Sequence, residues 1–275
     1  MNTFKISLDC APEGAYLDAY IPSILPNKKR RALLIIPGGG YSSLAEEREG
    51  SPIAEAFIPY GFTPFVLHYY VGKKKPFPIQ LIQSSYAIKH IKEHAEEYGI
   101  APDEVFAVGF SAGGHLAGSL AVMNSYAELY QGTGIDPESI KLRGAMLIYP
   151  VITPKYHIAS FKNLLCTAEP GESELELVSL DKQVTENCAP VFIMHTSNDG
   201  AVNVMNSLAL AEAYSSVGTE YEMHIYPDAP HGIALANDIT SENVEKWNNK
   251  RIAEWVRMSS EWADELIKKQ KKDKV

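Results

Sequence analysis

Short, unbroken apolar runs alternate along this chain with longer segments whose apolar residues recur every three or four positions. Unbroken runs are typical of strands buried on both faces, and the longer period is that of amphipathic helices. The predicted strands cover residues 4–8, 15–21, 31–36, 63–70, 104–108, 145–151, 190–196 and 221–226. The predicted helices cover residues 51–58, 78–98, 112–121, 202–217 and 242–269. This alternation predicts an α/β fold with a mostly parallel central sheet and helices on both faces.

More detailed predictions can be made for some of these strands and helices. The first two strands are expected to be antiparallel. Ser51 followed by Pro52 predicts a helix with a serine N-cap and a proline in its first turn. The segment that contains Trp247, Trp255 and Trp262 is expected to form a single C-terminal helix.

With 275 residues, 45% of them hydrophobic, the chain can bury a large core. It contains no evident repeat or linker, so we expect a single domain. Residues 152–189 lie between two predicted strands and are expected to be an insertion over the functional site. Tyr156, Phe161, Leu164 and Leu165 of this insertion could line a pocket. The alternative is a surface excursion with packed aromatic side chains.

Charge and cysteine content narrow the function classes. A formal net charge of −9 and an isoelectric point near 5.4 argue against binding to nucleic acid, which needs a basic surface. No apolar run approaches the ~20 residues of a membrane span, and the first residues lack a signal-peptide core, so we expect no membrane association and a cytoplasmic location. Cys10, Cys166 and Cys188 form no C-x-x-C pair, which favours reduced thiols.

The most specific chemical signal is the sequence G-F-S-A-G at residues 109–113, between a predicted strand and a predicted helix. In that context the pattern indicates a nucleophile elbow, a sharp turn that exposes the hydroxyl of Ser111. The pattern alone is easily met by chance, and an ordinary tight turn is the alternative.

A glycine run supports the elbow. Strand 31–36 ends in Pro37-Gly38-Gly39-Gly40-Tyr41. The amides of Gly39 and Gly40, together with that of Ala112, could stabilise a developing oxyanion. The alternative is a flexible turn, since glycine clusters usually mark loops.

An acid and a histidine follow the serine in the chain. Asp199 comes after strand 190–196, and His231 comes after strand 221–226. Ser–Asp–His is one of the chain orders in which a serine triad occurs. His231 would take the proton of Ser111, and Asp199 would fix the tautomer of the imidazole. Asp228 is the rival acid, and a surface loop is the alternative setting for His231.

Other histidines have simpler interpretations. His90 and His94 stand four apart on a predicted helix, but charged neighbours and the lack of a third ligand favour a solvated face, so we expect no metal site. His115 is expected to pack against the sheet. His195 and His224, which lie within strands, are weaker candidates for the base.

These motifs resemble those of the α/β-hydrolases, in particular bacterial carbohydrate acetylesterases of the acetylxylan-esterase-like group, which are related to hormone-sensitive-lipase-like esterases. The matching residues are 37–41, 48–50, 52, 109–117, 179–180, 184–185, 195–196, 199, 206–208 and 230–232. Two positions depart from the pattern: Pro37 stands where many relatives carry histidine, and Asn203 where relatives often carry proline.

The resemblance implies a serine esterase that forms an acyl-Ser111 intermediate, needs no cofactor and removes acetyl groups from soluble carbohydrates such as xylo-oligosaccharides. Tyr41 and Tyr156 are the candidate substrate-binding side chains. A peptidase or arylformamidase with the same triad is the enzymatic alternative. A non-catalytic binding protein on the same fold is the alternative from another class. Assembly as a homodimer is left open.

Overall fold

The computed structural model describes residues 1–9, 11–23, 28–123, 126–241 and 244–273, which contain one eight-stranded sheet. Its strands are β1 (Asn2–Ser7), β2 (Tyr16–Ile21), β3 (Arg30–Ile36), β4 (Phe62–His68), β5 (Ile100–Phe110), β6 (Gly144–Ile148), β7 (Val191–Thr196) and β8 (Tyr221–Tyr226). They lie in the order β1-β2-β4-β3-β5-β6-β7-β8. The pairs β1–β2 and β2–β4 are antiparallel, and every other neighbouring pair is parallel. The predicted α/β class and the antiparallel leading strands are confirmed.

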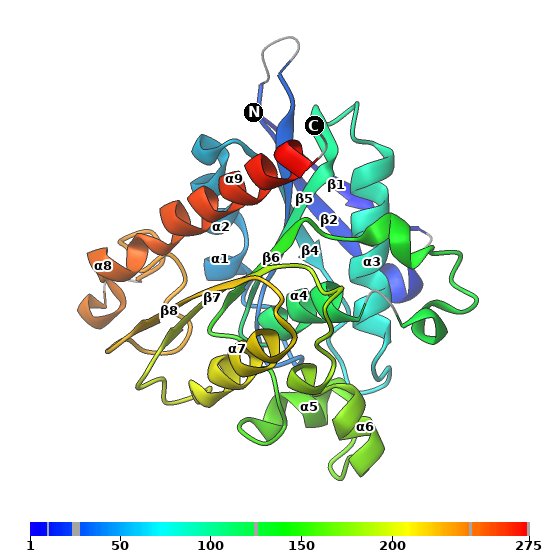
Figure 1. Cartoon of the computed structure of the whole chain (residues 1–275), viewed down its shortest axis with the longest axis vertical. Helices are drawn as coiled ribbons and strands as arrows, with labels where there is room; N and C mark the ends of the chain where they lie inside the picture. The colour runs from blue at the N-terminus through cyan, green and yellow to red at the C-terminus, as the bar shows by residue number, and fades with distance from the viewer. Residues whose placement is uncertain (10, 24–27, 124–125, 242–243, 274–275) are drawn as a thin grey trace.

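Helices cover both faces of this sheet (Figure 1). They are α1 (Glu46–Glu49), α2 (Ser51–Phe57), α3 (Ile79–Glu93), α4 (Ala112–Val122), α5 (Ile158–Leu164), α6 (Glu172–Leu177), α7 (Met205–Val217), α8 (Lys250–Ala253) and α9 (Trp255–Asp273). Short 3₁₀ turns are η1 (Pro12–Gly14), η2 (Ile58–Tyr60), η3 (Ala127–Tyr130), η4 (Pro137–Ile140), η5 (Leu180–Lys182) and η6 (Glu245–Trp247). Phe57 of α2 and Trp255 of α9 pack together on one face, and Leu81, Leu116 and Leu210 of α3, α4 and α7 share the core of the other.

The C-terminal segment departs from its prediction. Instead of one helix over 242–269, the described part holds η6, α8 and then α9, and residues 242–243 lie outside the described residues. The side chain of Asn249 accepts hydrogen bonds from the amides of Arg251 and Ile252, so it caps α8 and stops the helix from extending backwards. Trp247 therefore lies before the helices, whereas Trp255 and Trp262 are buried in α9.

The start of α2 also differs from the prediction. The unpredicted helix α1 comes directly before it, and the amide of Gly50 donates to the carbonyl of Glu46. Gly50 thus occupies the N-cap of α2, while Ser51 is its first residue and makes no capping bond. Pro52 lies in the first turn as predicted, and the apolar face with Ile53 is buried.

The turn between β5 and α4 presses the helix against the end of β3. A Cβ atom on Gly113 would lie 2.1 Å from the carbonyl oxygen of Ile36 and 2.5 Å from that of Pro37. A Cβ atom on Gly109 would lie 2.1 Å from the carbonyl oxygen of Gly113. Because backbone atoms cannot move aside as a flexible side chain can, both positions of the G-x-S-x-G pattern require glycine.

We expect Gly113→Ala to lower the free energy of unfolding by about 1–3 kcal/mol, since the added methyl group overlaps two backbone carbonyls. Gly200→Ala is the control, because nothing lies within 4 Å of the Cβ position of Gly200. Urea unfolding of both variants beside the wild type measures the difference. If Gly113→Ala is as stable as Gly200→Ala, the packing at the elbow is not as described.

Candidate active site

Ser111 lies between the end of β5 and the start of α4, in a strained backbone conformation with φ 53° and ψ −117°. Its amide donates to the carbonyl of Ile148, and its carbonyl accepts from the amides of His115 and Val151. These bonds fix the turn from both sides. The hydroxyl is thereby held at the carboxyl edge of the sheet, where the loops after neighbouring strands meet.

His231 lies in the loop after β8 and links the serine to the acid. Its Nε2 lies 2.9 Å from the Oγ of Ser111, and its Nδ1 lies 2.7 Å from the Oδ2 of Asp199. An ionised carboxylate can only accept, so Nδ1 carries the proton and Nε2 is left to accept from the serine hydroxyl. The structure thus brings together the three residues predicted as a triad, in the geometry that the proton transfer needs.

Asp199 lies just after β7 with its carboxylate almost fully buried. Its Oδ1 accepts from the amides of Ala201 and Val202, each at 2.9 Å. Its Oδ2 lies 3.3 Å from Nε2 of His195. Burial alone would raise the pKa of Asp199, but the bonds from His195, His231 and the backbone outweigh it and hold that pKa well below its usual range. The carboxylate is therefore charged across the neutral range.

His195, for which the sequence predicted no role beside the acid, lies against the carboxylate of Asp199. Its Nδ1 bonds to the Oγ of Ser207 at 2.7 Å, and its Nε2 lies 3.0 Å from the carbonyl oxygen of Val202 and near Asp199. It is fully buried. A histidine within an otherwise apolar strand, four residues before the acid, was the available signal.

The rival acid does not reach the imidazole. Asp228 is exposed, and its Oδ1 accepts from the side-chain amide of Asn198 at 2.5 Å. Asn198 in turn accepts from the amide of Ala229, which shapes the loop before His231. The contact with the imidazole favours Asp199 as the triad acid.

The glycine loop after β3 passes directly beside the serine. A Cβ atom on Gly38 would lie 3.1 Å from the Cβ of Ser111. Gly39 has φ 121° and Gly40 has φ 64°, values that favour glycine. Asn163 of α5 donates to the carbonyl of Gly40 at 2.8 Å, which holds this loop from outside.

Ala112 is the first residue of α4, so its amide has no partner within the helix and lies at the positive end of the helix dipole. The predicted oxyanion donors of Gly39, Gly40 and Ala112 therefore lie on the two segments that flank the hydroxyl. Their role in the reaction stays a prediction.

Comparison with known proteins identifies the family. The BD-FAE family model matches residues 17–214. The chain belongs to the BD-FAE family of α/β-hydrolases. It is 35% identical over 216 residues to endo-1,4-β-xylanase B of Butyrivibrio fibrisolvens, which covers 76% of this chain and 33% of the xylanase. It is 26% identical over 241 residues to an acetylxylan esterase of Xylanibacter ruminicola, covering 84% of this chain and 46% of that one. The chain thus spans less than half the length of these curated relatives.

Solved structures agree over nearly the whole chain. An acetyl ester-xyloside bifunctional hydrolase from Caldicellulosiruptor lactoaceticus superposes with a TM-score of 0.81 at 27% identity, covering 96% of both chains. Carboxylesterase Cest-2923 from Lactobacillus plantarum superposes with a TM-score of 0.86 at 25% identity, covering 96% of this chain and 98% of that one. The α/β-hydrolase fold and the resemblance drawn from the motifs are confirmed.

Tyr41 and Tyr156 take different places in this BD-FAE protein. Tyr41 is buried, and its hydroxyl bonds to Nδ1 of His115 at 2.7 Å, so its phenol supports the glycine loop from within. His115 also donates from Nε2 to the carbonyl of Val178, and burial lowers its pKa to about 4. Tyr156 is half-buried at the start of the insertion. This position leaves Tyr156 the more accessible of the two candidates.

Residues 152–189 contact the glycine loop through Asn163, and their role as an insertion over the site stays a prediction. Phe161 and Leu164 are fully buried, and the ring of Phe161 meets that of His115 edge-on at 5.1 Å. The aromatic side chain therefore fills the core, as the alternative interpretation of this segment held. His157, which the sequence reasoning missed, bonds to the carbonyl of Ala201 and to the Oγ of Ser160. Burial lowers its pKa, and the neighbouring His231 lowers it further.

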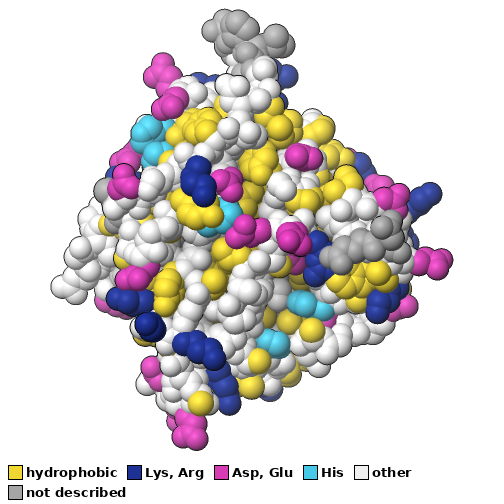
Figure 2. All heavy atoms as spheres, turned by 180° about the vertical axis from the view of Figure 1, so that it is seen from behind, with side chains coloured by type: hydrophobic (Ala, Val, Ile, Leu, Met, Phe, Trp, Pro, Cys, Tyr) yellow, Lys and Arg dark blue, Asp and Glu magenta, His cyan; other side chains and the backbone are white. Residues whose placement is uncertain are grey.

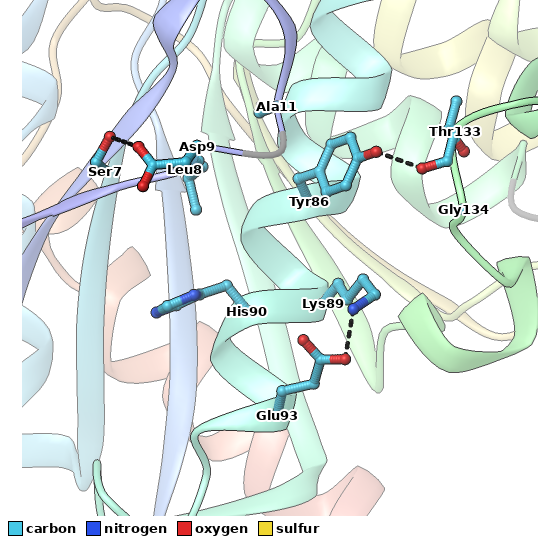
Figure 3. Close-up of a pocket in the computed structure, with 10 residues that line it drawn as sticks. All are labelled: Ser7, Leu8, Asp9, Ala11, Tyr86, Lys89, His90, Glu93, Thr133 and Gly134. Atoms are coloured by element: carbon cyan, nitrogen blue, oxygen red, sulfur yellow. Dashed lines mark hydrogen bonds and ion pairs between the residues drawn. The ribbon is translucent and has the colours of Figure 1, made fainter.

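One surface cleft lies away from Ser111. A cleft of about 420 Å³ lies between β1 and α3 (Figure 3), and three strands separate β1 from β5 in the sheet. Within it Ser7 bonds to Asp9, and Lys89 pairs with Glu93, so its polar groups bind one another and do not converge on a ligand. On the face in Figure 2, basic side chains lie in several separate places with acidic ones among them.

His90 and His94 are half-buried, as partly solvated side chains on α3 and just after it, and they stack at 4.0 Å while His90 bonds to the hydroxyl of Tyr98. The ring of Tyr98 lies about 6 Å from both imidazole rings, with centroids 6.1 Å from His90 and 6.0 Å from His94. Among the described residues, no cluster of His, Cys, Asp and Glu side chains could hold a metal ion. In that same part of the chain, no helix has both the length and the apolar composition that crossing a membrane requires.

Asp199→Asn is expected to slow the reaction of Ser111 with a fluorophosphonate probe by orders of magnitude, because the amide stabilises the wrong imidazole tautomer. The same change costs about 10⁴-fold in kcat in serine proteases. Asp228→Asn, the matched control, is expected to cost about tenfold or less, mostly through stability. Labelling rates and melting curves of both purified variants measure this. A well-folded Asp228→Asn that fails to react, beside a reactive Asp199→Asn, would overturn the assignment.

Proposed function

We propose that this BD-FAE protein is a serine esterase that hydrolyses acetyl and other short acyl esters of soluble carbohydrates such as xylo-oligosaccharides. The observation that carries this proposal is the hydrogen-bonded series from Asp199 through His231 to Ser111, with the serine at the N-terminus of α4. A serine hydroxyl is a poor nucleophile unless a base removes its proton. Here the base and the group that orients it are both within hydrogen-bond distance.

In the acylation step, the Oγ of Ser111 attacks the ester carbonyl while its proton passes to Nε2 of His231. The carbonyl π electrons move onto oxygen, and the amides of Gly39, Gly40 and Ala112 stabilise the resulting oxyanion. Asp199 stabilises the imidazolium that forms. When the oxyanion collapses, the bond to the sugar oxygen breaks and His231 returns its proton to the departing alcohol. The product is acyl-Ser111.

Deacylation repeats these steps with water. His231 takes a proton from water as the water oxygen attacks the acyl carbonyl, and a second oxyanion forms at the same amides. Its collapse breaks the bond to the Oγ of Ser111, which regains the proton from His231. The acid leaves and the resting site is restored. These steps use only side chains and amides of the chain, and the proposal includes no cofactor.

The substrate class rests on similarity. Two of the proteins it resembles are named for acetylxylan and for acetyl ester-xyloside hydrolysis. A Cβ atom on Gly40 would lie 3.8 Å from the Oγ of Ser160 and 4.0 Å from the side-chain nitrogen of Asn163, so the insertion lies within ordinary contact distance of the loop. The preference for a short acyl group rests on the resemblance to acetylesterases. The free thiols of Cys166 and Cys188 favour a cytoplasmic location.

Ser111→Ala is expected to abolish hydrolysis of aryl acetates while leaving the melting temperature close to that of the wild type, because only one hydroxyl is removed and the backbone bonds of the turn remain. Ser216→Ala, an exposed serine on α7, is the control. Activity above a few per cent in Ser111→Ala would reveal another nucleophile. Failure of wild-type Ser111 to label with a fluorophosphonate would favour a binding protein.

Acyl-chain preference is expected to be short, with a higher kcat/KM for aryl acetate than for aryl octanoate. A panel that adds acetylated xylo-oligosaccharides, aminoacyl amides and N-formyl arylamines tests the substrate class at the same time. Faster hydrolysis of octanoate would rule out an acetylesterase. A preference for amides or formyl arylamines would favour the peptidase or arylformamidase alternative.

A further inference from the structure

Glu49 is a buried carboxylate that the proposed reaction does not use. It is the last residue of α1 and is 2% exposed. Its Oε2 accepts from the amide of Gly38 at 2.7 Å, and its Oε1 accepts from the hydroxyl of Tyr149 at 2.9 Å. Both partners donate, and a carboxylate is the side chain that accepts at both of its oxygens.

Burying this group is costly, which calls for a compensating function. Burial raises the pKa of Glu49, although the bonds from Gly38 and Tyr149 and the charges of His231 and Arg48 oppose that effect. A buried carboxylate is tolerated when it is fully hydrogen-bonded, and removing one partner then leaves an unsatisfied group. Such networks fix one arrangement of the segments that they join.

The first segment that Glu49 holds is the glycine loop. Gly38 sits against the elbow, since a Cβ atom there would meet the carbonyl oxygen of Phe110 at 2.7 Å and the Cβ of Ser111 at 3.1 Å. The bond from the Gly38 amide therefore fixes the loop one residue before Gly39. A shift of this residue would move the predicted oxyanion donors relative to the serine.

The second segment is the loop that carries the histidine. The hydroxyl of Tyr149, besides donating to Glu49, accepts from the amide of Ala234 at 3.1 Å. The ring of Tyr149 meets the ring of His231 edge-on, with centroids 5.0 Å apart. Tyr149 itself has φ 38° and donates its amide to Met194 at 2.6 Å, so its position is strongly constrained. Through Tyr149, Glu49 is thus connected to the loop of residues 231–236.

We propose that Glu49 is a positioning residue that holds the oxyanion donors and the catalytic histidine at fixed positions relative to Ser111. The inference rests on the proposed function and assigns a role to a residue that touches neither substrate nor reacting atoms. Its effect belongs to the transition state, because the ester carbonyl becomes an oxyanion only there. Displacing these groups relative to Ser111 should therefore lower kcat more than it changes KM.

Glu49→Gln tests this directly, because the amide keeps the shape of the side chain but can accept at only one of its two ends. We expect kcat for an aryl acetate to fall by at least about tenfold, with KM within about threefold of the wild type. An aryl trifluoromethyl ketone, whose adduct on Ser111 carries an oxyanion, should bind more weakly by a similar factor to the loss of kcat/KM. Glu47→Gln, an exposed glutamate on the same helix, changes the net charge equally and should match the wild type.

Tyr149→Phe gives an independent test and decides the matter if Glu49→Gln does not fold. It removes the bridging hydroxyl and keeps the ring against His231, and we expect a loss of the same kind. The double variant should lose less than the product of the two single losses, since both act through one network. Folded single variants with kcat and inhibitor affinity equal to those of the wild type would overturn the role of Glu49. A wild type that hydrolyses no ester would instead overturn the proposed function.

Discussion

The backbone conformation of Ser111 is the constraint on which the rest of the site depends. Its φ of 53° and ψ of −117° lie outside the regions that residues with side chains ordinarily adopt, at a cost of about 1–3 kcal/mol. Dense packing retains it, because Ile148 and Val151 bond to the serine backbone and Gly113 touches the end of β3. The strain places the hydroxyl where the loops after β3, β7 and β8 converge.

Each partner of the serine is in turn held by groups that do not react. Asp199 is oriented by two backbone amides and lies beside His195, and the glycine loop is held by Glu49 from within and by Asn163 from outside. Donors fixed in this way need no reorganisation as charge develops, which is how an enzyme stabilises a transition state beyond what water can do. The insertion thus supports the site as well as bordering it.

Much of the fold and of the candidate site could be predicted from the sequence, since unbroken apolar runs identify parallel strands and the order of motifs identifies the triad candidates. The features that the predictions missed have two causes, one local and one between distant residues. The break before α8 depends on the side chain of Asn249, which competes locally with a continuous helix. The burial of Glu49 depends on Tyr149, one hundred positions further along the chain, and no local pattern signals that bond.

In the proposed reaction Ser111 carries the acyl group between the two half-reactions, and this can be observed directly. Rapid acid quenching of the protein during turnover of an aryl acetate, followed by peptide mapping, locates any covalently bound acyl group. We predict a single acetyl group on the peptide that contains Ser111, with the modification on that serine. Turnover with acetyl found only on another residue, or on none at any time of quenching, would contradict the account.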